Sequence, residues 1–141
     1  MTGPAGSDPS AAPTPPPNPE SSTGLAPNVA GALSYLLGPI TGVLMLVLEK
    51  RSPFVRFHAA QSIGISVAWI VFWVAYSIVS TVLSLIPVIG WIAAILLLLL
   101  SVLVGLGGLF LWLFLMYKAW VGVEWEFPWV GEQSRRLLTG A

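Results

Sequence analysis

The sequence predicts an all-α integral membrane protein with three transmembrane helices and a disordered N-terminal tail. Residues 59–117 form a run of 59 residues without a single Asp, Glu, Lys or Arg, and a second uncharged run covers residues 29–48. Charged residues make up only 9% of the chain, against about 25% in soluble domains. At about 1.5 Å of rise per helical residue, both runs are long enough to cross a hydrocarbon core about 30 Å thick.

The N-terminal segment, residues 1–28, is predicted to be a disordered tail. It holds eight of the twelve prolines and no Lys or Arg. This composition cannot bury enough apolar surface to offset the entropy of ordering. A cleavable signal peptide is not predicted either, because a basic region followed by an apolar stretch is missing. We interpret the tail as solvated, with a proline-rich ligand for a partner domain as the alternative.

A membrane domain is predicted over residues 29–131, with spans at about 29–48, 60–86 and 91–117. The long uncharged run is divided by the segment IPVIGW, in which Pro87 lacks a backbone N–H and Gly90 permits a tight reversal. The second and third spans therefore form a hairpin. Ser52 and Pro53 suit the N-cap and the first position of the second helix.

The distribution of charge predicts an orientation. All six basic residues lie either in the first loop or in the C-terminal tail: Lys50, Arg51, Arg56, Lys118, Arg135 and Arg136. The positive-inside rule places both segments in the cytoplasm. Three spans would then put the N-terminus outside a bacterial inner membrane, with residues 132–141 as a short cytoplasmic tail. In the alternative, the first helix is re-entrant around Gly38 and Pro39, and the N-terminus returns to the cytoplasm.

The segment after the third span is predicted to lie on the membrane surface. Between residues 123 and 129, apolar positions alternate with Glu124, Glu126 and Pro128. A period of two indicates an extended strip and not a fourth span. Residues 133–138 are predicted to form one short surface helix.

Small residues in the first span predict close helix packing. Gly38 and Gly42 form a small-xxx-small pair, and Pro39 must interrupt the helix, with Thr41 available to satisfy the freed carbonyl groups. We interpret such pairs as packing within one monomer. The alternatives are a seam between copies of the chain and, for the broken helix, part of a transport site.

The densest group of polar residues lies where the chain enters the membrane. It comprises Glu49, Lys50, Arg51, Arg56, His58, Gln61 and Ser62, with Lys118 from the third helix. We expect Glu49 to pair with a Lys or Arg side chain and His58 to cap a polar network. The alternative is a contact site for anionic lipid headgroups or a peptide.

Several classes of function are not indicated. The chain has no cysteine, one histidine and zero net charge, so we expect no metal site, no cofactor and no nucleic-acid partner. The predicted spans hold no ionisable side chain, which ion-coupled transporters generally need. No catalytic grouping or phosphate-binding loop occurs, and we expect neither catalytic residues nor enzymatic activity.

Four segments resemble, in order, a family of small bacterial membrane proteins of unknown function: YLLGPITGVLMLVLEK, FVRFHAAQS, IPVIGW and LFLMYKAWVGVEWEFPWVG. This family is similar to the Tic-type chloroplast import component and includes the magnetosome proteins MamF and MmsF. The resemblance covers about residues 32–131. It implies a three-helix protein with a role in membrane organisation or in a larger assembly. The chloroplast relatives have four spans, so their import role is not carried over.

The resemblance also implies a set of structural and interaction residues: Gly38, Pro39, Gly42, Glu49, Arg56, Phe57, His58, Gln61, Ser62, Pro87, Gly90 and Lys118. The expected partners are membrane lipid and either further copies of the chain or a larger membrane-protein complex. Our first hypothesis is therefore a non-enzymatic component that organises the membrane or an assembly. The second is a component of a transport or channel pathway.

Overall fold

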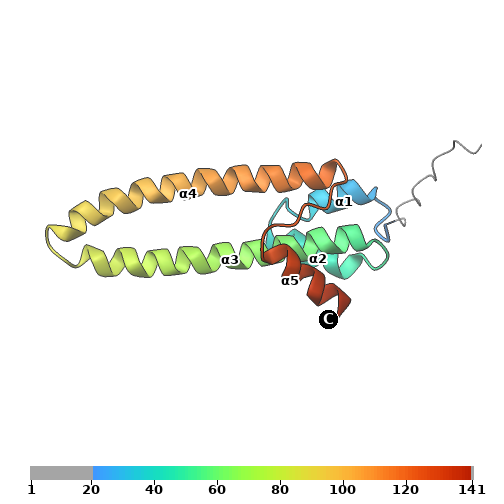
Figure 1. Ribbon diagram of the computed structural model, residues 1–141, viewed down its shortest axis with the longest axis horizontal. Coiled ribbons are helices and arrows are strands. Elements are labelled where there is room, and N and C mark those ends of the chain that lie inside the picture. The colour runs from blue at the N-terminus through green and yellow to red at the C-terminus, as the bar shows by residue number, and fades with distance from the viewer. Residues whose placement is uncertain (1–20, 141) are drawn as a thin grey trace, which may run out of the picture.

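The computed structural model describes residues 21–140, and within them the protein is all-α. Its five helices are α1 (Pro27–Leu33), α2 (Pro39–Leu48), α3 (Pro53–Ser84), α4 (Ile89–Trp120) and α5 (Val130–Thr139). The long helices α3 and α4 run side by side as a hairpin, and the three short helices gather at one end of it (Figure 1). We call this end the base and the opposite end the tip.

The hairpin of α3 and α4 confirms the predicted reversal around Pro87. Helix α3 begins as expected, with Pro53 in its first turn and the Ser52 Oγ accepting a hydrogen bond from the Val55 N–H. At the tip, a Cβ on Gly90 would lie 2.9 Å from the Leu83 carbonyl oxygen. This close approach requires glycine, because any side chain there would displace the end of α3.

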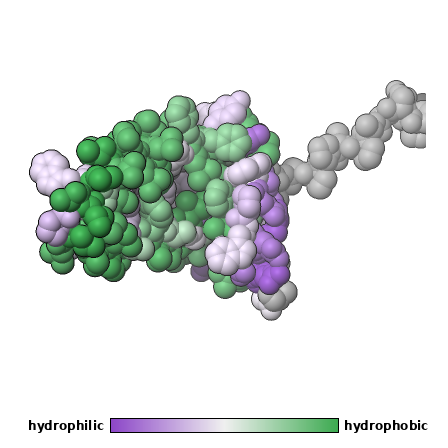
Figure 2. All heavy atoms as spheres, turned by 60° about the vertical axis from the view of Figure 1, so that its left-hand side comes forward, coloured by the Kyte–Doolittle hydropathy of each residue, from purple (hydrophilic) through white to green (hydrophobic). Residues whose placement is uncertain are grey.

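Helices α3 and α4 are the two candidate membrane spans among the described residues. Each has 32 residues, or about 48 Å of helix, and almost none of the apolar stretch of either is buried within the protein. On the face shown in Figure 2, apolar side chains cover the surface away from the base, and hydrophilic ones collect at the base. A surface of this kind suits contact with lipid chains.

The single span predicted over residues 29–48 is instead two short helices, separated at the interruption that Pro39 predicts. Residues 34–38 form a turn between α1 and α2, which we call the α1–α2 turn. Gly38 has a φ of 59°, a backbone conformation that glycine adopts readily, and Pro39 begins a new helix because it has no N–H to continue the old one. With 10 residues, α2 reaches only about 15 Å, so the described chain has two candidate spans and not three.

The chain reverses its direction at this turn. Asn28 Nδ2 donates a hydrogen bond to the Trp120 carbonyl at the end of α4. The Tyr35 carbonyl accepts one from Trp112 Nε1, about two helical turns nearer the tip. Glu49, after α2, lies back beside Ser22. Helices α1 and α2 thus enter and leave at the base, as the re-entrant alternative requires.

Polar side chains satisfy the exposed backbone of the α1–α2 turn. The Thr41 Oγ1 accepts a hydrogen bond from the Leu37 N–H and donates to the Ser34 carbonyl, both at 3.1 Å. The Ser62 Oγ donates to the Gly38 carbonyl at 3.1 Å. Non-helical backbone is tolerated at membrane depth only where protein groups pair with it, so these contacts permit the turn to enter lipid.

The beginning of the described chain lies at the base, beside Lys50 and Arg51. The Ser22 Oγ accepts hydrogen bonds from the backbone N–H groups of both residues. Residues 21–28 and the basic loop thus lie at the same end of the hairpin because α1 and α2 double back, whereas three spans would place them at opposite ends. Of the predicted tail, residues 1–20 fall outside the described residues. Residues 21–28 do not extend freely from the base, because they form a turn and the start of α1.

Gly42 allows α2 to pack closely on α3, and its replacement by alanine is expected to destabilise the protein. The added Cβ would lie 2.9 Å from Ile63 Cγ1 and 3.1 Å from the Ala59 carbonyl oxygen. We expect Gly42→Ala to lower the free energy of unfolding by about 1–3 kcal/mol, the usual cost of overpacking. Gly107→Ala is the control, because a Cβ there would meet no other part of residues 21–140 within 4 Å. Equal stabilities of the two variants in detergent would contradict close packing at Gly42.

Candidate functional site

Several polar side chains are buried at the base, and five of them are each at most 3% exposed and are considered as one group: Tyr35, Glu49, His58, Gln61 and Ser62. We call this group the polar base. Its members come from the α1–α2 turn, from the end of α2 and from the first turns of α3. Buried polar groups are costly unless they are hydrogen-bonded, so their partners indicate what the group does.

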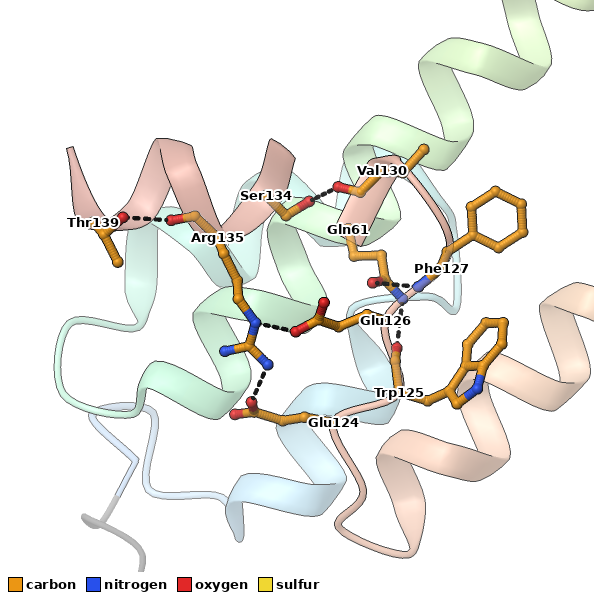
Figure 3. A network of polar contacts seen from close by, with 9 residues as sticks. All are labelled: Gln61, Glu124, Trp125, Glu126, Phe127, Val130, Ser134, Arg135 and Thr139. Carbon is orange, nitrogen blue, oxygen red and sulfur yellow. Dashed lines mark hydrogen bonds and ion pairs between the residues drawn. The ribbon is translucent and has the colours of Figure 1, made fainter. Parts of the chain in front are cut away.

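Gln61 joins α3 to the α1–α2 turn and to the extended segment before α5, residues 123–127. Figure 3 shows its contacts with that segment. Its Nε2 donates hydrogen bonds to the Trp125 carbonyl at 3.1 Å and to the Tyr35 Oη at 3.2 Å. Its Oε1 accepts a bond from the Phe127 N–H at 3.2 Å. Both ends of the amide are thus occupied, and the extended segment before α5 is held against α3.

His58 packs in an aromatic setting and continues the same network. Its ring makes edge contacts with Phe54 and Phe57, at centroid distances of 4.5 and 5.3 Å. Its Nδ1 lies 3.0 Å from the Tyr35 Oη. Because that hydroxyl accepts from Gln61, we assign it as the donor to Nδ1, which leaves the imidazole proton on Nε2. Among residues 21–140, no group pairs with the Nε2 in hydrogen-bond geometry.

Glu49 is enclosed by hydrogen-bond donors. The carboxylate accepts from the backbone N–H groups of Ser22, Arg51 and Ser52 at 2.8–3.0 Å. The hydroxyl groups of Ser21 and Ser22 donate to it as well. Burial raises the pKa of Glu49, but these hydrogen bonds outweigh it, and the net pKa lies well below its ordinary value.

The expected ion pair of Glu49 is not among those that residues 21–140 form. Arg56 instead donates from Nη1 to the Glu49 backbone carbonyl at 2.9 Å, where it caps the end of α2. The carboxylate turns away to the N–H groups that precede α3. Anions are favoured at a helix N-terminus, which is why backbone donors can replace a cationic side chain here.

Arg135 fastens α5 over the extended segment (Figure 3). Its guanidinium group binds Glu124 at 2.9 Å and also contacts Glu126. The same group lies 4.6 Å from the centre of the Phe57 ring, a cation–π distance. Hydrogen bonds to Glu126 and Glu124 raise the pKa of Arg135. The predicted surface helix is present as α5, and the extended segment before it is bound to Gln61.

The structure brings most of the predicted site residues together at the base. Gly38, Pro39 and Gly42 form or flank the α1–α2 turn, and Lys118 lies near the end of α4 with its Nζ 5.3 Å from the Phe114 ring centre. Pro87 and Gly90 lie at the tip and belong only to the hairpin reversal. Sequence reasoning missed Tyr35, whose hydroxyl within an apolar stretch was the available signal. It also missed Ser21, Ser22, Trp112, Trp125 and Arg135 as partners.

Comparison with known proteins decides the family. Residues 22–133 match the model of the magnetosome magnetite crystal formation protein family, described by the names MamF and MmsF. The chain belongs to this family. The matched residues include the whole polar base, both long helices and the extended segment that Gln61 holds.

The chain is also similar to archaeal membrane proteins. A UPF0132 membrane protein of Archaeoglobus fulgidus is 44% identical over 113 residues, which cover 80% of this chain and 96% of the relative. The UPF0132 membrane protein MJ1443 of Methanocaldococcus jannaschii is 42% identical over 113 residues, 80% of this chain and 89% of the relative. No solved structure shows significant similarity. This member of the family is thus a membrane protein, and the names of these two relatives state no activity.

Proposed function

We propose that this protein is a non-enzymatic component that organises the membrane or assembles with other membrane proteins. The observation that carries the proposal is the internal use of the polar base. Hydrogen bonds from the side chains of Gln61, Tyr35 and Glu49 connect the short helices and the extended segment to α3. Such a network builds a rigid platform and leaves a surface of apolar and aromatic side chains for contacts.

The hydroxyl-bearing face of α3 gives no support to a transport path. Ser77, Thr81 and Ser84 each donate a hydrogen bond to a carbonyl of their own helix. A solute pathway needs polar groups that face a common lumen. Solute flux in proteoliposomes that changed on substitution of Ser77 or Thr41 would overturn the assembly proposal in favour of transport.

The proposed membrane arrangement has two spans and a re-entrant pair, α1 and α2, in the leaflet at the base. The basic residues lie at the base of the molecule. Helix α5 lies at the same end (Figure 1). The positive-inside rule then places the base, with both ends of the described chain, on the cytoplasmic side of the cell membrane. The tip, residues 85–88, reaches the opposite face.

Single cysteines test this arrangement, since the chain has none of its own. We expect Ala26→Cys and Gln133→Cys to react with a membrane-impermeant maleimide only in inverted vesicles. Val88→Cys, whose native side chain is 74% exposed at the tip, is expected to react only in intact cells. Reaction of Ala26→Cys from outside would contradict the two-span arrangement, and unchanged expression of each variant serves as the control.

Photocrosslinking tests the assembly role. Trp129 is 79% exposed at the base, so a photoreactive residue there reports what the base contacts in native membranes. We expect covalent products with a second copy of the chain or with one defined membrane protein, identified by mass spectrometry. The same probe at Val88 should not give those products. Adducts with lipid alone at position 129 would count against assembly through the base.

A further inference from the structure

A cleft of about 390 Å³ lies between α3, α4 and the α1–α2 turn. Its lining includes Gly38, Ser62, Ser66, Ile70, Leu109 and Trp112. Trp69 reaches from α3 to α4 beside it, where a Cβ on Gly108 would overlap the indole ring. The cleft is therefore bounded by Gly38 at the α1–α2 turn and by the contact of Gly108 with Trp69 across the hairpin.

The serine hydroxyl groups and the Trp112 indole N–H on the wall of the cleft are already paired. The Ser66 Oγ donates to the Ser62 carbonyl at 2.7 Å, and the Ser62 Oγ donates to the Gly38 carbonyl. The Trp112 Nε1 donates to the Tyr35 carbonyl at 2.6 Å. Apart from the indole N–H of Trp69, the remaining lining is apolar, so most hydrogen-bonding groups of a polar ligand would be buried without partners. The wall favours a hydrocarbon ligand.

The cleft opens onto the surface that faces lipid. Ile70 and Leu109 at its edge are 55% and 50% exposed, and they belong to the two candidate spans. In a bilayer, apolar surface at this position is already in contact with hydrocarbon chains. A chain entering the cleft would continue that contact without crossing a polar region.

The dimensions of the cleft suit a single hydrocarbon chain and are too small for a partner helix. Ser62 to Ile70 covers about 12 Å along α3, so a volume of about 390 Å³ corresponds to a mean cross-section of roughly 30 Å². An α-helix about 10 Å in diameter needs roughly 80 Å². A single hydrocarbon chain, with carbon contacts at about 4 Å, needs only about 20 Å².

We propose that this cleft binds one acyl chain of a membrane lipid. The chain lies between α3 and α4 and fills the space beside Ser66, with its contacts extending to Leu109 and Trp112. Bound hydrocarbon there supports the α1–α2 turn from the side that protein does not cover. The site depends on the membrane location of the protein and not on the proposed assembly role.

The test uses delipidated full-length protein in detergent, where added lipid is scarce and binds only at preferred places. The probe is dioleoylphosphatidylglycerol with a diazirine near the end of one acyl chain. Native mass spectrometry is expected to show one retained lipid per chain. After irradiation, adducts at Leu109 should exceed those at Leu106 at least fivefold. These residues lie one turn apart on α4 and are 50% and 52% exposed, but Leu106 does not line the cleft.

Ser66→Phe fills the cleft, and Ser77→Phe is its matched control. Both serines lie on α3 and donate to the carbonyl four residues earlier, at 2.7 and 2.8 Å, but Ser77 faces outward away from the cleft. We expect Ser66→Phe to lower lipid retention at least fivefold and Ser77→Phe to leave it within twofold. If Ser66→Phe does not fold, as judged by circular dichroism, the proposal is tested by the adducts at Leu109 and Leu106 in the unaltered protein. Evenly spread adducts, or crosslinks to a second copy from the cleft, would overturn the proposal.

Discussion

Replacement of Gln61 by leucine is expected to lower the free energy of unfolding by about 3 kcal/mol and to release the C-terminal segment. The change leaves the Trp125 carbonyl, the Phe127 N–H and the Tyr35 hydroxyl without their partner. Each buried polar group left unpaired costs about 1–3 kcal/mol. Leucine conserves most of the side-chain volume, so the loss measures polar contacts more than a cavity.

Two measurements check this expectation. Denaturant titration in mixed micelles gives the change in stability. Limited trypsin digestion after Arg135 and Arg136 reports whether α5 has come loose, because an ordered helix resists cleavage. Gln133→Leu is the control, since Gln133 is exposed on α5 and its loss should change stability by less than about 0.5 kcal/mol. Resistance to trypsin equal to that of the unaltered protein would contradict the anchoring role of Gln61.

Replacement of Glu49 by glutamine is the second large effect expected. The amide brings an N–H₂ group against donors from Ser21, Ser22 and Ser52, so at least one donor loses its acceptor. We expect the free energy of unfolding at neutral pH to fall by about 2 kcal/mol, in the range for a buried unpaired group. Glu132→Gln is the control, because its ion pair with Arg136 is exposed and worth well under 1 kcal/mol.

The pH dependence of that difference follows from the depressed pKa of Glu49. A carboxyl whose pKa is lower in the folded state stabilises that state fully above its unfolded pKa of about 4.3. The contribution is lost as the pH falls below that value toward the lower folded pKa. The stability difference between the unaltered protein and Glu49→Gln should therefore be constant from neutral pH to about pH 5 and shrink at lower pH. A difference that does not change below pH 4 would show that the charge of Glu49 is not what stabilises the base.

Individual residues show how much of this structure sequence patterns can predict. Pro87 and Gly90 predicted the hairpin, because a missing N–H and a close backbone approach act locally. Gly38 and Pro39 predicted an interruption in the same way, but not the direction of the chain after it. An interrupted helix can kink onward or turn back, and the choice depends on what covers the freed backbone. Here Ser62 from α3 and Trp112 from α4 pair with the turn, and neither is near it in sequence.

Sequence patterns could not predict the hydrogen-bond partners of the site residues. Glu49 was expected beside a cation, since charge near charge is the simplest local reading. Its donors instead include Ser21 and Ser22, almost thirty positions earlier and within a segment whose composition predicts disorder. Composition measures the average tendency of a segment to fold, and two serines captured by one buried carboxylate do not alter that average.

The sequence by itself determined the class of the protein, its two long apolar helices and the position of their reversal, because uncharged length and proline or glycine breaks act through local physics. Only the tertiary structure decided that α1 and α2 return to the base and that Gln61 binds residues more than sixty positions later. It also placed a hydrocarbon-sized cleft between α3 and α4. These features depend on contacts between distant parts of the chain, whose hydrogen bonds and packing exist only after the helices have assembled.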